Sequence, residues 1–253
     1  MVGEERLVHD LHGACERGEI VAHYQPQFDL ATGRIVAAEA LARWNHPELG
    51  LIAPGVFIPI AEDQALIHTL GRHMIEQVLA AVTSWNERGI ALEVSVNVSA
   101  NQLTTLAFFD LLDRDLGRVG LPANAITIEI TESYPILDTP SIAIRLDELR
   151  QRGLGISIDD YGIGYSSLQQ LERIPATELK IDRSLVQDGS VQSLALMTAI
   201  VELAHWRGLR VVAEGIETDE QLALVRELGC ERAQGFLLAM PMPLAELESL
   251  LTA

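Results

Sequence analysis

Cysteine, long apolar runs and a secretory leader are scarce or missing in this sequence. Its two cysteines, Cys15 and Cys230, lie far apart and outside any metal-ligand spacing, which predicts reduced thiols rather than a cysteine metal site. No uninterrupted apolar run reaches membrane-spanning length. The first residues, Met1–Glu5, include two acids and form no apolar run, so we expect no secretory signal. These absences predict a cytoplasmic protein without membrane contact.

Basic residues are also in short supply. The chain has 18 Lys and Arg against 36 Asp and Glu, a formal net charge of −18. Polymeric nucleic acid and anionic membranes bind through basic patches, so both are excluded as nonspecific partners. An anionic substrate would need positive charge of another kind.

The chain shows no linker, internal repeat or low-complexity tract. Hydrophobic residues make up 48% of its 253 residues, enough for a sizeable core. We therefore predict a single domain over residues 1–253, with residues 1–18 forming a flanking helix outside it.

Eight short β-rich runs alternate with longer helical stretches. Most are nearly continuous in Val, Ile, Leu and Ala, which is typical of parallel strands buried on both faces. Eight such strands interleaved with helices predict the α/β class and a TIM-type (β/α)8 barrel. The runs are Ile20–Gln25, Arg34–Leu41, Leu92–Val98, Ile126–Thr131, Gly155–Asp159, Glu178–Ile181, Arg210–Glu214 and Ala233–Leu237.

The first two predicted strands are joined by a short turn at Ala31–Gly33. A parallel crossover needs a dozen or more residues, so this link predicts one antiparallel strand in the barrel. Helix signals lie between the other strands. The stretch Leu66–Asn86 has apolar residues close to helical spacing, and Thr218 with Gln221 fits a capping box.

Polar residues stand at or near the ends of most of these runs. Parallel strands deliver their carboxyl ends to one face of a barrel, and that face carries the active site of barrel enzymes. An isolated acid after a strand, such as Asp182 or Glu214, is commonly a helix N-cap, and Glu39 alone can be a core carboxylate paired with Arg43. The repetition favours a functional site. Its members are Glu39, Asn97, Glu129, Asp159, Asp160, Lys180, Asp182, Glu214 and Gln234.

Several converging carboxylates need positive charge among them, because each buried unpaired charge is costly. Lys180 alone is too little, whereas divalent cations suffice. Ligands that are all oxygen select Mg²⁺ or Mn²⁺ over zinc. The adjacent Asp159 and Asp160 can address two ions, the usual arrangement for phosphodiester hydrolysis. Such ions would also attract a phosphate to an acidic protein.

These segments, taken in order, resemble the EAL-domain family of cyclic di-GMP phosphodiesterases. The resemblance implies a barrel with one reversed strand and hydrolysis of cyclic di-GMP to the linear dinucleotide pGpG. The motifs that carry it are Glu39-Ala40-Leu41 with Arg43, Tyr24-Gln25-Pro26, Asn97-Val98-Ser99, Glu129-Ile130-Thr131-Glu132, Asp159-Asp160-Tyr161-Gly162, Leu179-Lys180-Ile181-Asp182, Ala213-Glu214-Gly215-Ile216-Glu217 and Gln234-Gly235-Phe236.

The resemblance also implies a role for each matching residue. Ligands of one metal would be Glu39, Asn97, Glu129 and Asp159. Ligands of the second would be Asp159, Asp160 and Glu214. The catalytic groups would be Lys180, which orients water or assists proton transfer, with Glu214 and Glu217. Gln234 and Glu217 would support water and metal from outside. Substrate contacts would be Gln25, Arg43, Asp182 and Gln234. The ions would be Mg²⁺ or Mn²⁺, and Ca²⁺ is expected to inhibit.

Two other functions stay open at this point. One is a non-catalytic cyclic di-GMP receptor, although such relatives typically lack ligands that are all present here. The other is an unrelated barrel hydrolase acting on another phosphodiester. The resemblance further implies a homodimer, a regulatory domain outside this chain, and a mobile gate after Asp160. Gly162 and Gly164 would give the gate freedom, and Glu132 would pin it.

Overall fold

The computed structural model describes residues 4–105, 108–110, 112, 114, 124–131, 140–162, 171 and 173–252. The strands are β1 (Ile20–Asp29), β2 (Ile35–His46), β3 (Gly50–Ile52), β4 (Glu93–Asn97), β5 (Ile126–Thr131), β6 (Gly155–Tyr161), β7 (Glu178–Ile181), β8 (Arg210–Ala213), β9 (Arg232–Ala233) and β10 (Met242–Pro243). The helices are α1 (Glu4–Leu11), α2 (Pro54–Asp63), α3 (Ile67–Glu87), α4 (Ala100–Leu103), α6 (Pro140–Gln151), α8 (Arg183–Asp188), α9 (Val191–Trp206), α10 (Asp219–Leu228) and α11 (Leu244–Leu251).

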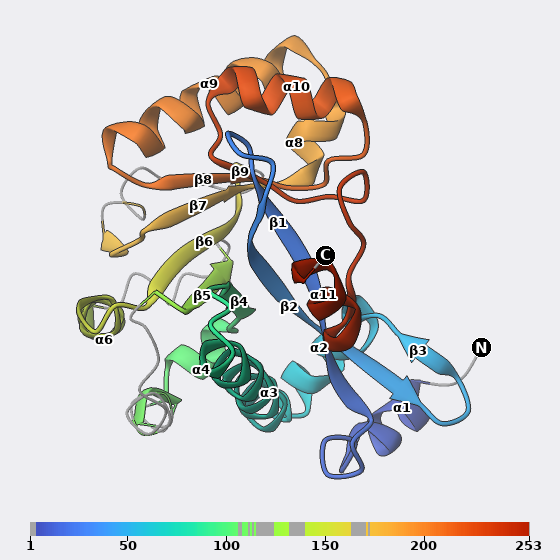
Figure 1. The fold of residues 1–253 in the computed structure, drawn as a ribbon. Helices are drawn as coiled ribbons and strands as arrows, with labels where there is room; N and C mark the ends of the chain where they lie inside the picture. The colour runs from blue at the N-terminus through green and yellow to red at the C-terminus, as the bar shows by residue number, and fades with distance from the viewer. Residues whose placement is uncertain are drawn as a thin grey trace.

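Eight of the described strands close into a barrel in the order β1, β9, β8, β7, β6, β5, β4 and β2, and β2 pairs with β1 to complete the circle (Figure 1). Neighbours from β2 round to β9 are parallel, whereas β1 is antiparallel to both of its barrel neighbours. The predicted barrel with one reversed strand is therefore confirmed. Short strands β3 and β10 pair outside the barrel, with β2 and β1.

The turn between β1 and β2 sets the reversed direction. The Asp29 carboxylate accepts hydrogen bonds from the Thr32 backbone N–H at 2.7 Å and hydroxyl at 2.6 Å. Gly33 follows with a φ of 71°, a left-handed conformation that glycine adopts without steric cost. So tight a connection returns the chain directly beside itself, which leaves only antiparallel pairing.

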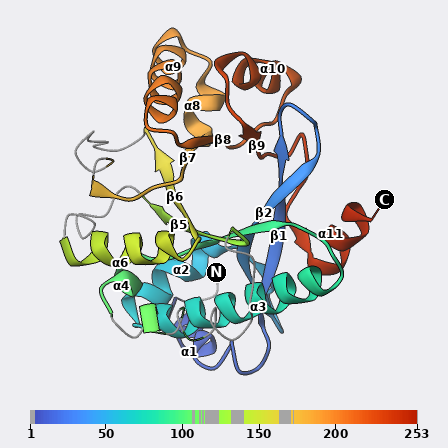
Figure 2. The same cartoon turned by 60° about the vertical axis from the view of Figure 1, so that its left-hand side comes forward.

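Helices cover the outside of the barrel, and the apolar core lies between the two layers. Helices α8, α9 and α10 lie together on one side, and α3 lies on the opposite side (Figures 1 and 2). The aromatic side chains of Trp44, Trp85 and Phe57 are 0% exposed. The C-terminal helix α11 lies beside β1, and its Glu248 accepts a 2.8 Å hydrogen bond from the Trp85 indole. No helix in the described part of the chain is both long and apolar enough to span a membrane.

The local helix signals read from the sequence correspond to real helix ends. Helix α3 matches the apolar spacing predicted over residues 66–86. Thr218 and Gln221 form the predicted capping box at the start of α10, and Gly229 ends that helix in a left-handed conformation.

The last predicted strand is wrong beyond Ala233. The apolar run that follows is a turn, because its backbone groups bond to neighbouring loops instead of to a strand. The Leu237 N–H donates to the Ile216 carbonyl at 3.0 Å, and the Ala239 N–H donates to the Gly235 carbonyl at 3.0 Å. Apolar composition marked this segment as a strand, yet Phe236 is 56% exposed.

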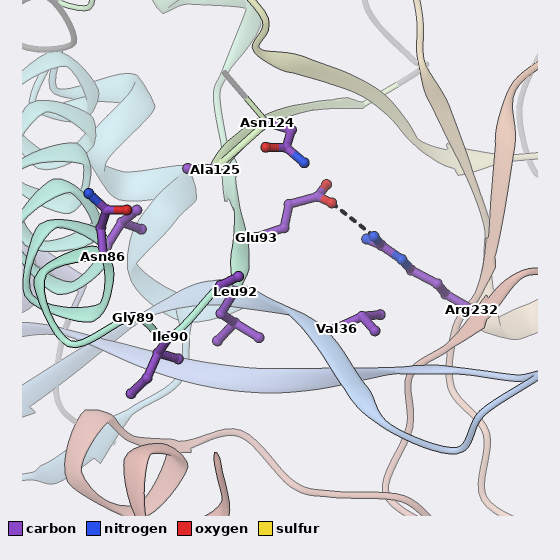
Figure 3. A pocket seen from close by; sticks show the side chains of 11 residues that line it. Val36, Asn86, Gly89, Ile90, Leu92, Glu93, Asn124, Ala125 and Arg232 are labelled. Atoms are coloured by element: carbon purple, nitrogen blue, oxygen red, sulfur yellow. Dashed lines mark hydrogen bonds and ion pairs between the residues drawn. The ribbon is translucent and has the colours of Figure 1, made fainter. Parts of the chain in front are cut away.

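A network of ion pairs lies at the amino-terminal end of the barrel. Glu93, Glu178, Arg210 and Arg232 are each the first residue of their strands. The Glu93 carboxylate lies 2.7 Å from an Arg210 nitrogen and 2.9 Å from an Arg232 nitrogen. Arg210 also contacts Glu178 at 2.7 Å. Figure 3 shows Glu93 and Arg232 facing each other beside a pocket of about 270 Å³.

Replacing Glu93 with Gln is expected to lower the free energy of unfolding by about 2–3 kcal/mol at pH 7, because two arginines then share one carboxylate. The partial exposure of Arg210 screens its pair, so the loss is smaller than for a fully buried pair. Denaturant unfolding of wild type and Glu93→Gln measures it.

The same pair of proteins tests the pH dependence of this network. Burial alone would raise the pKa of Glu93, but the charges of Arg232 and Arg210 outweigh it and hold the pKa below its usual value. The stabilisation is therefore complete above the unfolded-state pKa, at about 4.3, and is lost as pH falls through the lower folded-state pKa. The difference in the free energy of unfolding between wild type and Glu93→Gln should therefore become smaller below about pH 4. A gap of constant size from pH 7 to pH 3 would show that the charge of Glu93 does not stabilise the fold.

Candidate active site

The opposite, carboxyl-terminal end of the barrel gathers the polar residues predicted from the sequence. Inward-facing side chains in such barrels form layers, each supplied by alternate strands. Glu39 on β2, Glu129 on β5 and Lys180 on β7 meet in this way. Asp159 on β6 and Glu214, directly after β8, join them. Parallel register brings together residues that lie far apart in the sequence.

Lys180 is the centre of this group. Its side chain is 0% exposed, and its Nζ lies 2.6 Å from Glu214, 3.0 Å from Glu129, 3.3 Å from Glu39 and 3.4 Å from Asp159. Burial disfavours the ammonium, but the surrounding carboxylates outweigh burial and hold the pKa of Lys180 well above its usual range. One lysine is thus shared among four acids.

Neutral amides hold Glu39 in place. Its Oε1 accepts a 2.8 Å hydrogen bond from Asn97, and its Oε2 accepts a 2.6 Å bond from Gln234. The Gln234 amide also donates to Gln25 at 3.0 Å, and Gln25 donates to the Ala239 carbonyl at 3.1 Å. Burial opposes ionisation of Glu39, yet Lys180 and these amides keep its pKa below the usual value. Glu39 is therefore an oriented carboxylate.

A bulge in β6 turns two successive aspartates toward the mouth. Residues alternate between faces along a regular strand, so Asp159 and Asp160 would normally point apart. Here the pairing of β6 with β7 shifts between Ile158 and Tyr161, and Asp160 has a φ of 56°, uncommon for a residue other than glycine. Ligand oxygens of Asp159, Asp160 and Glu214 come within 4.8 Å of one another. Such strain is characteristic of functional sites.

The other carboxyl groups of the site have raised pKa values, because their surroundings disfavour the charged form. Burial raises the pKa of Glu214 to about 8 and that of Asp160 to about 6, and the charge of Asp159 adds to both shifts. Burial and then the charge of Glu39 raise the pKa of Glu129 well above its usual value. The mouth therefore has an excess of negative charge that Lys180 does not balance.

The residues fit a divalent cation. All the donors are carboxylate or amide oxygens, the ligand type preferred by Mg²⁺ and Mn²⁺. Glu129 is 1% exposed, and its Oε2 has no hydrogen-bond donor among the described residues. A buried carboxylate oxygen without a donor is costly, and metal coordination would satisfy it.

Other predicted residues lie around this cluster or outside the described residues. Asp182 is the N-cap of α8, where it accepts a 2.8 Å hydrogen bond from the Ser184 N–H, and its charge also raises the pKa of Asp160. Half-buried Arg43 donates to the Ala42 carbonyl. Glu217 is exposed and accepts a 3.0 Å hydrogen bond from Gln187.

The predicted gate is described only at its start. Gly162 has a φ of 105°, and a Cβ added there would come within 2.9 Å of both Leu185 and Ile200 side chains, so glycine is required for conformation and for space. Glu132 and Gly164 lie outside the described residues.

A pocket of about 450 Å³ opens beside the acidic cluster, and sequence reasoning missed its apolar side. Glu39, Asn97, Asp159 and Asp160 line one side of it, and residues of α2 and α3 line the other. Its apolar lining includes Pro54, Ile58, Leu70 and Met74. An apolar helix gives no local sign in the sequence that one of its faces borders a site.

The fold and the site together define a β/α barrel whose carboxyl-terminal end has a cluster of carboxylates that could hold a metal ion. The model of the EAL domain family matches residues 8–241. MucR of Pseudomonas aeruginosa, a bifunctional diguanylate cyclase/cyclic di-GMP phosphodiesterase, is 41% identical over 245 residues, covering 96% of this chain and 36% of that protein. RocR of the same organism, a cyclic di-GMP phosphodiesterase, is 38% identical over 244 residues, covering 96% of this chain and 62% of that protein.

A solved structure agrees with these relatives. The PaMucR phosphodiesterase in its c-di-GMP complex has a TM-score of 0.91 and 40% identity, covering 96% of this chain and 99% of that chain. The chain therefore belongs to the EAL domain family. It spans little more than a third of the length of MucR and under two thirds of RocR.

Proposed function

We propose that this chain hydrolyses cyclic di-GMP to linear pGpG with the help of two divalent cations, Mg²⁺ or Mn²⁺. The observation that carries the proposal is the complete oxygen ligand set around Lys180, including a buried Glu129 oxygen that lacks a hydrogen-bond donor among the described residues. Relatives named as cyclic di-GMP phosphodiesterases support the choice of substrate. Bound cations would supply positive charge for the phosphate and lower the pKa of an attacking water.

Each carboxylate has a distinct place in this proposal. Glu39, Asn97, Glu129 and Asp159 would hold one ion, and Asp159, Asp160 and Glu214 would hold the other. The amides of Asn97 and Gln234 fix the orientation of Glu39 before any ligand arrives. Preorganised ligands avoid the cost of rearrangement during the reaction.

Lys180 orients the attacking water or passes on its proton. Its Nζ lies within 3.4 Å of four of the proposed ligands, Glu39, Glu129, Asp159 and Glu214. The lysine is therefore close to where the reacting water would bind. Divalent cations beside it would oppose the carboxylates and shift the lysine toward its neutral form. Glu214 and Glu217 support the same step, Glu217 from the exposed side.

Substrate contacts surround the ions. Arg43 has a planar guanidinium suited to a phosphate or a guanine edge, and Gln25 and Gln234 present amides from β1 and the end of β9. Asp182 lies on the Asp160 side of the mouth. The apolar side of the 450 Å³ pocket, with Ile58 and Met74, suits the flat face of a base.

Chromatography of products after incubation of the chain with cyclic di-GMP and Mg²⁺ or Mn²⁺ tests the proposal. Release of pGpG is expected. Tight binding without any product would instead favour the alternative, a non-catalytic cyclic di-GMP receptor. Hydrolysis of other phosphodiesters with cyclic di-GMP left intact would favour a different barrel hydrolase.

The gate after Asp160 gives a further prediction, which rests on the family resemblance. If Glu132 pins a mobile loop and dimerisation orders it, Glu132→Ala should lower activity and weaken metal or substrate affinity while the barrel stays folded. Activity per subunit should also fall on dilution below the dimer constant. Kinetics combined with sedimentation measures both. Wild-type kinetics in Glu132→Ala, with constant specific activity through dissociation, would contradict the gate. A regulatory domain outside this chain would supply the signal that controls the gate.

A further inference from the structure

The barrel interior contains a polar layer directly below the acidic cluster. It consists of Gln27 on β1, Ser95 on β4, Ser157 on β6 and Val212 on β8. Ser95, Ser157 and Val212 are the strand partners of Glu39, Glu129 and Lys180, and Gln27 lies two residues below Gln25 on the same strand face. All four are at most 3% exposed. Barrel interiors are usually filled by bulky branched side chains, and this layer has only one.

The polar atoms of this layer lack partners. Gln27 Nε2, Ser95 Oγ and Ser157 Oγ are fully buried, and none of them has a hydrogen-bond partner among the described residues. Gln234 Oε1, just above them, is also buried and also lacks a hydrogen-bond partner among the described residues. The Ser95 hydroxyl lies next to Glu129 and favours the charged form of that carboxylate. Buried polar groups without partners are rare and costly, so four in one enclosed place call for a shared physical cause.

The fourth member of the layer gives an independent sign. Val211 and Ala213 belong to the continuous apolar core between the sheet and the helices. Val212 lies between them in the sequence and is also 0% exposed, yet it lies outside that core because it faces the barrel interior. Serine side chains are smaller than the branched residues usual at such positions, so we expect room for small molecules in this layer.

We propose that this layer encloses ordered water molecules, which complete the hydrogen bonds of Gln27, Ser95 and Ser157 and brace Glu129 and Gln234 from below. Water suits the site because the lining offers both donors and acceptors, and buried waters typically make about three hydrogen bonds. A monovalent cation fits less well, since the Gln27 Nε2 is a donor. This water cluster is separate from the cation ligands at the mouth.

A pair of isosteric substitutions tests whether the layer is wet. Val212→Thr adds a hydroxyl to the layer, where water can bond to it, so the melting temperature should stay within about 1–2 °C of wild type. Val211→Thr places the same hydroxyl in the dry apolar core and should lower the melting temperature by about 4 °C or more. Equal losses in the two variants would show that the layer is dry.

A crystal structure at about 1.5 Å tests the same inference directly. Water density is expected within about 2.7–3.2 Å of Gln27 Nε2, Ser95 Oγ and Ser157 Oγ. Direct bonds among these side chains, or no density between them, would overturn the proposal. Neither this structure nor the melting temperatures require bound metal, so failure here is distinct from failure of the proposed function.

The bracing of Glu129 rests on the proposed metal role and has its own test. Ser157→Val fills the layer and removes a hydroxyl, whereas Ser157→Thr has the same shape and keeps it. Ser157→Val is expected to weaken Mn²⁺ affinity by about tenfold relative to Ser157→Thr, as for other groups that orient metal ligands. Titration followed by electron paramagnetic resonance measures this without turnover. Equal affinities in the two variants would contradict the bracing role.

Discussion

Removing divalent cations is expected to abolish hydrolysis of cyclic di-GMP, with a loss of about a thousandfold or more. Among the described residues, Lys180 supplies the positive charge at the centre of the mouth, and four carboxylates already share it. Without cations, the site would repel a phosphodiester. Adding Mg²⁺ or Mn²⁺ back to chelator-treated protein should restore the rate.

Ca²⁺ is the matched control for this experiment. It has the same charge and prefers oxygen ligands, but it accepts larger and less regular coordination. It should therefore support binding of cyclic di-GMP and inhibit its hydrolysis, because the attacking water is misplaced. Full activity in chelator-treated protein, confirmed metal-free by elemental analysis, would contradict the two-cation proposal.

Substitutions of Glu39 and Lys180 are expected to fail in different ways. Glu39→Ala removes a carboxylate oriented by Asn97 and Gln234, so metal affinity and activity should be lost together. Lys180→Ala leaves every proposed ligand in place and should lower turnover by about 10²–10⁴-fold while cyclic di-GMP affinity changes little. Lys180→Met, which keeps the length of the side chain, controls for lost packing.

Calorimetry with cyclic di-GMP in Ca²⁺ separates these outcomes because no turnover occurs. Affinity should drop steeply in Glu39→Ala and stay near wild type in both Lys180 variants. Unfolding curves in the same buffer show whether each variant is folded. Equal loss of binding in Glu39→Ala and Lys180→Met would refute the division of roles.

Buried parallel strands were the easiest feature to predict from the sequence. Ile126–Thr131 and Glu178–Ile181 match the observed β5 and β7, because an aliphatic residue at every second position is typical of a strand with one face packed under helices. The run Phe236–Leu238 is apolar throughout and is a turn. Its conformation depends on hydrogen bonds to Ile216, which is distant in the sequence, and local composition does not report such bonds.

The sequence offers candidates for the site but not its geometry. Glu129 and Asp159 stand near strand ends, which parallel strands bring to one face, whereas Glu39 lies inside β2. The position of Asp160 depends on a strand bulge and a left-handed φ. Glycine would have signalled such a conformation in the sequence, but an aspartate does not. The polar layer holding Ser157 was also missed, since a serine within an apolar strand is unremarkable until its neighbours are known.

The most direct test of the central claim is a crystal of this chain grown with Mn²⁺ and pGpG, with the ions located by their anomalous scattering. The account predicts two peaks about 3.5–4 Å apart in the mouth, sharing Asp159 as a ligand. One peak should contact Glu39 and Glu129, and the other should contact Asp160 and Glu214. A mouth without anomalous peaks, or with peaks bound only by other residues, would contradict the account.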